Sequence, residues 1–142
     1  MGKQMLKLGA PGALILLLAG CAGLRSPIAP SGPTPEQQQW IAGSADLAAL
    51  GCGILMIERP GDVQTARDGL AAAAQVLRSD YPQVIDLATA LDHALPRQYA
   101  WVTAIVVARI RMRAGDAGVL PLDSVPWQMA DTFVETCRQV LQ

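Results

Sequence analysis

The sequence predicts an all-α fold, a single bundle of about five helices that follows a Pro-rich linker. Two observations predict it: apolar residues recur at helical spacing in successive stretches, and helix-start signals precede those stretches. We expect the helical domain to span residues 36–142, which is long enough for one modest hydrophobic core. No internal repeat is found, and no heptad pattern continues across several of the stretches.

The first helix is expected to begin at Pro35. Thr34 is placed as its N-cap, Pro35 suits the first helical position, and Gln37 stands where it would complete a capping box. Helical spacing assigns these residues to the inner side: Trp40, Ile41, Ser44, Leu47, Ala48, Gly51, Ile54 and Leu55. Gly51 weakens the helix but permits another backbone to approach closely, as do Gly43 and Gly53. Residues 53–58 also fit a strand, so the end of this helix stays open.

The second and third helices follow breaks in the chain. Arg59-Pro60-Gly61 interrupts the first helix, and Asp62 is positioned to cap the second. The inner residues of the second helix are Val63, Ala66, Leu70, Ala73 and Leu77. Asp80 and Pro82 are expected to open the third helix, whose inner residues are Val84, Leu87, Ala88, Leu91 and Leu95.

The fourth helix, opened by Pro96, is the most apolar part of the domain. Its apolar residues cover nearly every side: Trp101, Val102, Ala104, Ile105, Val106, Val107 and Ala108. A helix that is apolar all round is expected at the centre of a bundle. Arg109, Arg111 and Arg113 then close it, which places cations at the negative end of the helix dipole.

A loop at residues 115–124 leads to the last helix. Ser124 or Asp123 is expected to cap this helix, and Pro126 lies near its first position. Its inner side is formed by Val125, Met129, Phe133, Cys137 and either Val140 or Leu141. Cys137 is therefore expected to point inward.

The N-terminus carries the pattern of an export signal. Lys3 and Lys7 accompany an apolar run at residues 8–18, which fits the ~7–15 residues of a signal peptide and falls short of the roughly 20 that span a bilayer. The sequence Leu18-Ala19-Gly20-Cys21 then resembles the lipobox of bacterial lipoproteins. This resemblance implies cleavage before Cys21, with diacylglycerol on its sulfur and an acyl chain such as palmitate on its new amino group. An ordinary secretory signal with an incidental Cys21 is the alternative.

The resemblance divides the chain into a signal peptide at residues 1–20, a lipidated tether at residues 21–35 and the helical domain. The tether is Pro-rich, which favours extended backbone at about 3.1 Å per residue. Ala22 rather than Asp follows the cysteine, and in enterobacterial lipoproteins this favours the outer membrane. We therefore expect an anchor in the bacterial outer membrane, with the domain facing the periplasm.

If Cys21 carries the lipid, Cys52 and Cys137 are the two cysteines that remain free to form a disulfide. An exported chain meets an oxidising compartment, where a disulfide between them would persist. In the chain-entropy treatment, a disulfide that closes a loop of about 85 residues stabilises the folded protein by roughly 4–5 kcal/mol. Two buried free thiols are the alternative.

Composition and motifs argue against several classes of function. Beyond residue 20 only arginine supplies positive charge, and no basic run remains that would bind nucleic acid. The single histidine, His93, has only Asp86, Asp92 and Tyr99 nearby, too few ligands for a metal site. The sequence lacks both a Gly-x-Ser-x-Gly and a Cys-x-x-Cys motif. We expect no enzyme, no cofactor and no metal.

The leading hypothesis is a lipid-anchored, non-enzymatic module that binds another envelope protein. Trp40 and Trp127 are its candidate partner-binding residues, with core packing as the equal alternative, whereas Trp101 is expected in the core. The expected architecture is similar to that of pilotins, the small lipoproteins that escort secretins, and to prophage-type accessory lipoproteins. The alternatives are a carrier that encloses a lipid or other apolar ligand and, less favoured, an envelope hydrolase that uses His93 or an Asp.

Overall fold

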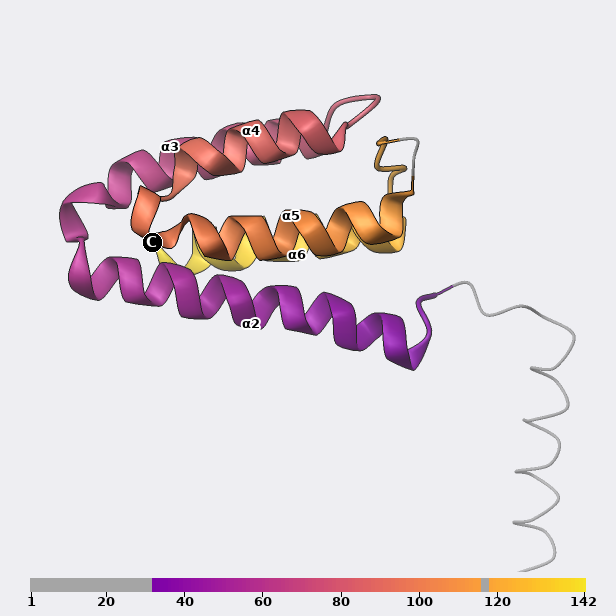
Figure 1. Ribbon diagram of the computed structural model, residues 1–142, viewed down its shortest axis with the longest axis horizontal. Coiled ribbons are helices and arrows are strands. Elements are labelled where there is room, and N and C mark those ends of the chain that lie inside the picture. The colour runs from indigo at the N-terminus through magenta and orange to yellow at the C-terminus, as the bar shows by residue number, and fades with distance from the viewer. Residues whose placement is uncertain (1–31, 116–117) are drawn as a thin grey trace, which may run out of the picture. The chain divides into compact units, whose positions relative to one another are not determined.

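The computed structural model describes residues 32–115 and 118–142, of which Thr34–Gln142 form one compact unit. The described part confirms an all-α bundle of five helices (Figure 1). The helices are α2 (Pro35–Glu58), α3 (Val63–Leu77), α4 (Val84–Ala94), α5 (Ala100–Ala114) and α6 (Val125–Val140), with 3₁₀ turns η1 (Pro60–Asp62) and η2 (Arg97–Tyr99). The expected signal peptide and nearly all of the expected tether lie outside the described residues.

The last helix, α6, lies at the centre of the bundle. It packs against α2, α3 and α5, while α3 and α4 form a second pair that closes the bundle on the side opposite α2 (Figure 1). Its fully buried residues include Met129, Phe133 and Cys137, as the sequence predicted. The guanidinium of Arg67 on α3 donates to the carbonyl oxygens of Leu141 and Gln142, which fixes the end of the chain.

The predicted starts of α2 and α6 are confirmed. The Thr34 hydroxyl oxygen accepts from the Gln37 backbone N–H at 3.2 Å, and the Gln37 side-chain oxygen accepts from the Thr34 N–H at 2.9 Å. Ser124 caps α6 by accepting from the backbone N–H of Trp127 at 3.3 Å. Because α2 stays helical to Glu58, the strand alternative for residues 53–58 is excluded.

Two helix starts differ from the prediction. Asp62 occupies the N-cap position of α3 but makes no cap bond, because its carboxylate pairs with Arg59 Nε at 3.0 Å. The third helix begins at Val84, after Pro82. An antiparallel bridge between Gln83 and Val119 holds this segment extended and delays the helix.

The prediction that the fourth helix lies at the centre is wrong. Only one side of α5 is buried, by Val102, Thr103, Val106, Val107 and Ile110. Trp101, expected in the core, is 45% exposed. The central position belongs to α6, and among the described helices none packs against the outer side of α5 (Figure 1). An apolar composition on all sides of a helix therefore does not predict that this helix is the most buried one, because another helix can occupy the centre.

Two glycines allow helices to approach closely. A Cβ at Gly69 of α3 would stand 2.5 Å from the Cα of Ala94 at the end of α4. A Cβ at Gly51 of α2 would stand 2.9 Å from Cγ1 of Val102 on α5, so a side chain, rather than the backbone that the sequence predicted, lies close to this glycine. At Gly53, by contrast, a Cβ would meet nothing within 4 Å.

A disulfide joins α2 to α6. Cys52 and Cys137 are fully buried and linked, with their Cα atoms 5.6 Å apart. Among the described helices, α2 alone is long and apolar enough to cross a membrane by length and composition. Such a helix is weak evidence for a membrane span, and here the disulfide and its packing against α6 make α2 a wall of the bundle.

Candidate functional site

The outer side of α5 is an exposed apolar stripe. Trp101, Ile105 and Met112 are 45%, 37% and 79% exposed, and the small residues Ala104 and Ala108 lie between them. Their spacing of three, four and seven residues places them on one side of the helix. Single exposed apolar residues are common on protein surfaces, whereas a group of them on one side of a helix makes a candidate interaction site.

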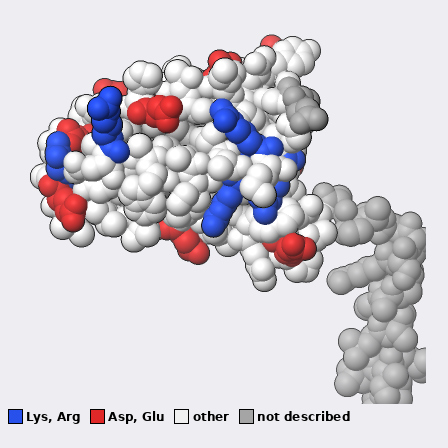
Figure 2. Space-filling model, viewed as in Figure 1, with Lys and Arg blue, Asp and Glu red and all other residues white. Residues whose placement is uncertain are grey.

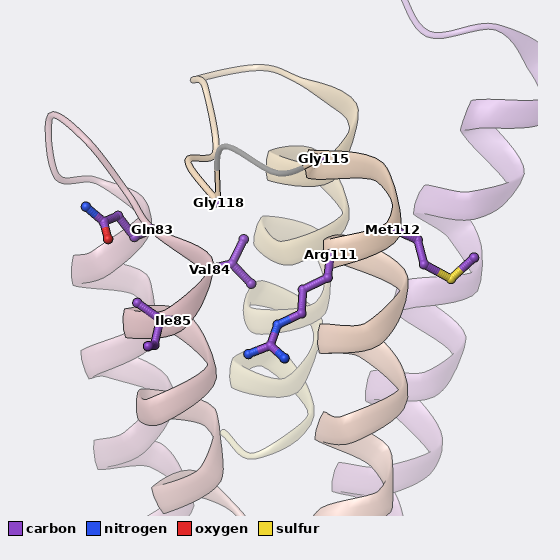
Figure 3. Close-up of a pocket in the computed structure, with 7 residues that line it drawn as sticks. All are labelled: Gln83, Val84, Ile85, Arg111, Met112, Gly115 and Gly118. Atoms are coloured by element: carbon purple, nitrogen blue, oxygen red, sulfur yellow. The ribbon is translucent and has the colours of Figure 1, made fainter.

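A groove between α4 and α5 continues this stripe. Its upper part is a hollow of about 540 Å³. This hollow is lined by Gln83, Val84, Ile85, Arg111, Met112, Gly115 and Gly118 (Figure 3). A second hollow of about 460 Å³ is lined by Ala88, Asp92, Ala104, Val107, Ala108 and Arg111. Arg111 borders both hollows, so they are neighbours along the groove between α4 and α5.

The name α4/α5 face is used below for nine residues taken from the groove and the stripe, all of them exposed except the half-buried Ala88. They are Ile85, Ala88, Asp92, Trp101, Ala104, Ile105, Ala108, Arg111 and Met112. Ile85 is 64% exposed, so α4 contributes a large apolar side chain as α5 does. The face is therefore apolar along its length and carries one charge of each sign.

The charges of the α4/α5 face are unpaired within the described part of the chain. Arg111 extends from α5 into the space toward α4, whereas Met112 points away from Val84 and Ile85 (Figure 3). The ion pairs of residues 32–115 and 118–142 involve Arg59, Arg78 and Arg138, and neither Arg111 nor Asp92 takes part. A guanidinium without a carboxylate partner, set among apolar side chains, is suited to bind a carboxylate from another molecule.

The two predicted partner-binding tryptophans lie elsewhere. Trp40 is half-buried on α2, with the guanidinium carbon of Arg113 3.8 Å from its ring centroid. Trp127 is half-buried at the start of α6, where its indole N–H donates to the Leu77 carbonyl oxygen at 3.0 Å. Both are engaged inside the domain, and Trp101 is the tryptophan that the fold leaves exposed.

Sequence reasoning missed Trp101 as a surface residue, although a signal existed. The series Trp101, Ile105, Met112 and the series Val102, Val106, Ile110 each have helical spacing, on different sides of one helix. A helix with two apolar sides has either two partners inside the fold or one inside and one outside. The sequence does not say which.

The residues considered for hydrolysis are not brought together. His93 is exposed on the last turn of α4, with its Nδ1 2.7 Å from the Thr89 carbonyl oxygen. Asp86 and Asp92 are exposed on the same helix. Within the described residues, no group of three His, Cys, Asp or Glu side chains is placed to hold a metal ion.

Two ionisable groups have shifted pKa values for structural reasons. The Tyr99 hydroxyl donates to Glu58 Oε2 at 2.6 Å, and this hydrogen bond to a carboxylate raises the pKa of Tyr99. Partial burial raises the pKa of Asp131, and the nearby charge of Glu135 adds to the effect. The first links α2 to η2 and the second lies on α6, so neither belongs to the α4/α5 face.

Cys21, the expected lipidation site, lies outside the described residues. No protein-family model matches the chain, and neither a curated protein nor a solved structure matches it.

Proposed function

We propose that this protein is a lipid-anchored cell-envelope module that binds another envelope protein and performs no catalysis. The α4/α5 face is the observation that carries the proposal, because it is an exposed apolar surface on a bundle closed by a buried disulfide. The lipobox-like sequence that ends at Cys21 supports the anchor, with outer-membrane sorting through Ala22. A disulfide between α2 and α6 fits an oxidising compartment outside the cytoplasm.

The partner that fits this face is an amphipathic helix with an acidic residue beside its apolar side. Two helices with a groove between them accept a third helix, whose anchor residues recur at helical spacing. Trp101 supplies the large aromatic contact that dominates many interfaces. Arg111, at the junction of the two hollows, supplies a donor for a carboxylate on the partner.

The lipid anchor is tested first and separately. Cells that produce the full chain are labelled with radioactive palmitate, and the protein is recovered and fractionated. We expect label on the wild-type protein and none on Cys21→Ser, with the variant released from the membrane fraction. An unlabelled wild type, or a Cys21→Ser protein that still sediments with membranes, would refute the anchor.

The partner site is tested by photo-crosslinking in intact cells of the host. A crosslinking amino acid is placed at Ile105 on the α4/α5 face or at Gln75, an exposed position on α3 that serves as the matched control. We expect one discrete crosslinked protein from position 105 and none from position 75. The same product from both positions would contradict the site.

Variants then test the chemistry of the same contact. With the crosslinker kept at position 105, Arg111→Glu should reduce the product at least tenfold, since a like charge would face the partner's carboxylate. Arg97→Glu, the same charge change on the turn before α5, should leave it unchanged. Equal yields from the two variants would remove the acidic helix from the proposal.

The carrier hypothesis makes a different prediction for the same surface. A carrier would enclose its ligand between apolar side chains, but Trp101, Ile105 and Met112 face outward, which favours docking over enclosure. Native mass spectrometry of gently purified protein separates the two. If a small apolar molecule stays bound in stoichiometric amount through purification, the carrier hypothesis would be favoured over a protein partner.

A further inference from the structure

A second surface lies on the α2 side of α5, where the last two turns of α5 meet the start of α2. The guanidinium of Arg113 stacks 3.8 Å above the Trp40 ring, and its Nη1 donates to the Arg109 carbonyl oxygen at 3.2 Å. Arg109 reaches the same part of α2, since its Nη1 is 3.6 Å from the position that a Cβ at Gly43 would occupy. Two guanidinium groups and one indole therefore gather beside the first turns of α2.

These arginines have no acidic partner among the described residues. Neither Arg109 nor Arg113 forms an ion pair, and Glu36 in the first turn of α2 pairs with neither. The Nε of Arg113 is buried without a hydrogen-bond acceptor. On the face shown in Figure 2, basic side chains gather over the C-terminal half of α5, and acidic side chains lie below them. Arginines that form no ion pair leave their charge available to an anionic surface.

The chain enters the domain at this end. Thr34 caps α2, and Trp40 lies less than two turns further on. If the lipid anchor at Cys21 is present, Thr34 stands thirteen positions after it, and an extended Pro-rich chain over that distance reaches at most about 40 Å. A tether this short keeps Arg109 and Arg113 at a millimolar effective concentration relative to the lipid headgroups. Even weak binding to the headgroups would then be populated for much of the time.

We propose that Arg109 and Arg113, with Trp40 beside them, bind the phosphate headgroups of anionic phospholipids and hold this end of the domain against its own bilayer. A guanidinium presents paired N–H donors that match phosphate oxygens. An indole is well suited to the headgroup layer, where its ring is half-buried and its N–H stays wet. Each arginine near an anionic membrane surface strengthens binding about fivefold. This proposal depends on the proposed anchor. It uses the α2 side of α5, whereas the proposed partner helix uses the groove between α4 and α5.

The test uses the chain from residue 22 onward, made without signal peptide or lipid, so that its outcome does not depend on lipidation. This chain contains the whole compact unit Thr34–Gln142. Its sedimentation is measured with vesicles of phosphatidylcholine alone and with vesicles in which phosphatidylglycerol replaces about a third of the lipid. We expect binding to the anionic vesicles at millimolar lipid, loss of binding in high salt, and no measurable binding to the neutral vesicles.

The variants separate this site from general charge attraction. Arg109→Gln/Arg113→Gln should weaken binding about 30-fold, and Arg109→Gln alone about fivefold. The single variant matters because Arg109 is exposed and its loss leaves the Trp40 stack in place. Arg97→Gln removes the same charge from the opposite end of α5 and should change binding less than twofold.

Equal binding to neutral and anionic vesicles would overturn the proposal. Binding of the double variant as tight as that of the wild type would overturn it too, as would a loss of binding in Arg97→Gln as large as that in Arg109→Gln. Failure here leaves the palmitate and crosslinking results untouched. Conversely, if palmitate does not label the protein but the chain binds anionic vesicles as expected, only the anchor is refuted.

Discussion

Gly69 is the position where one methyl group has the clearest consequence for the fold. In the structure, a Cβ at this position would stand 2.5 Å from the Ala94 Cα, 2.7 Å from its Cβ and 2.8 Å from its backbone nitrogen. Ordinary carbon–carbon contacts are about 3.5–4.0 Å, so α3 and α4 would have to separate by roughly 1 Å. No side-chain rotation relieves the clash, because two of the three atoms belong to the backbone of α4.

The expected magnitude combines two opposing effects. Forcing an extra methyl group into a packed interior typically costs about 1–3 kcal/mol, and a contact with backbone belongs at the upper end. Alanine favours helix over glycine by about 1 kcal/mol. We therefore expect Gly69→Ala to lower the free energy of unfolding by about 2 kcal/mol. For a domain of this size that corresponds to a decrease in Tm of roughly 8 °C.

Gly53→Ala is the matched control, because a Cβ there meets nothing within 4 Å. It should raise the free energy of unfolding by about 0.5–1 kcal/mol through helix propensity alone. Urea denaturation followed by circular dichroism measures both variants under oxidising conditions. If Gly69→Ala were as stable as Gly53→Ala, the close crossing of α3 and α4 would be refuted.

Three further changes test other parts of the fold. Cys52→Ala/Cys137→Ala should lower the free energy of unfolding by about 2–5 kcal/mol in urea titrations, and an unchanged midpoint would argue against the disulfide. Trp127→Phe leaves the Leu77 carbonyl without its indole donor and should cost about 1–2 kcal/mol in the same assay, whereas no loss would mean that the bond is not formed. Burial raises the pKa of Asp131 above its ordinary value of 3.8, so its contribution to stability is full below that pH and is lost as pH rises through the folded-state pKa. Asp131→Asn should therefore raise the free energy of unfolding at pH 7, by less than about 1 kcal/mol because the group is partly solvated, and Tm should rise with it. The gain should vanish below about pH 3.8. A gain that persists in acid would contradict burial of the charge as its cause.

Local sequence patterns predicted the features that neighbouring residues determine. The capping box of Thr34 and Gln37 and the Ser124 cap span three residues each, and both are present. The inner faces of α3 and α6 follow from spacing within one helix, and Leu70 and Phe133 are fully buried as expected. Such features depend on backbone geometry over one or two turns.

The features that the sequence did not predict depend on residues far apart in the chain. The start of α4 is set by Gln83 meeting Val119, and the tight crossing at Gly69 by an alanine on the next helix. The order of burial among helices depends on how all five pack. For this reason the apolar composition of α5 indicated the centre, whereas the fold leaves Trp101 on the surface.

The candidate site shows the same division. The sequence could single out Trp40 and Trp127, but their contacts with Arg113 and Leu77 join residues far apart in the chain and could not be expected from it. That Arg111 forms no ion pair with a described residue likewise depends on which carboxylates the fold brings near it.

The bond between Cys52 and Cys137 also determines how the chain responds to mechanical force. Since the sulfurs join positions 85 residues apart, a pull between the two ends of the domain travels through α2, across the disulfide and out along α6. The intervening chain, about 300 Å of contour length when extended, bears no tension while the bond is oxidised. Single-molecule stretching should show that hidden length only after a reductant is added.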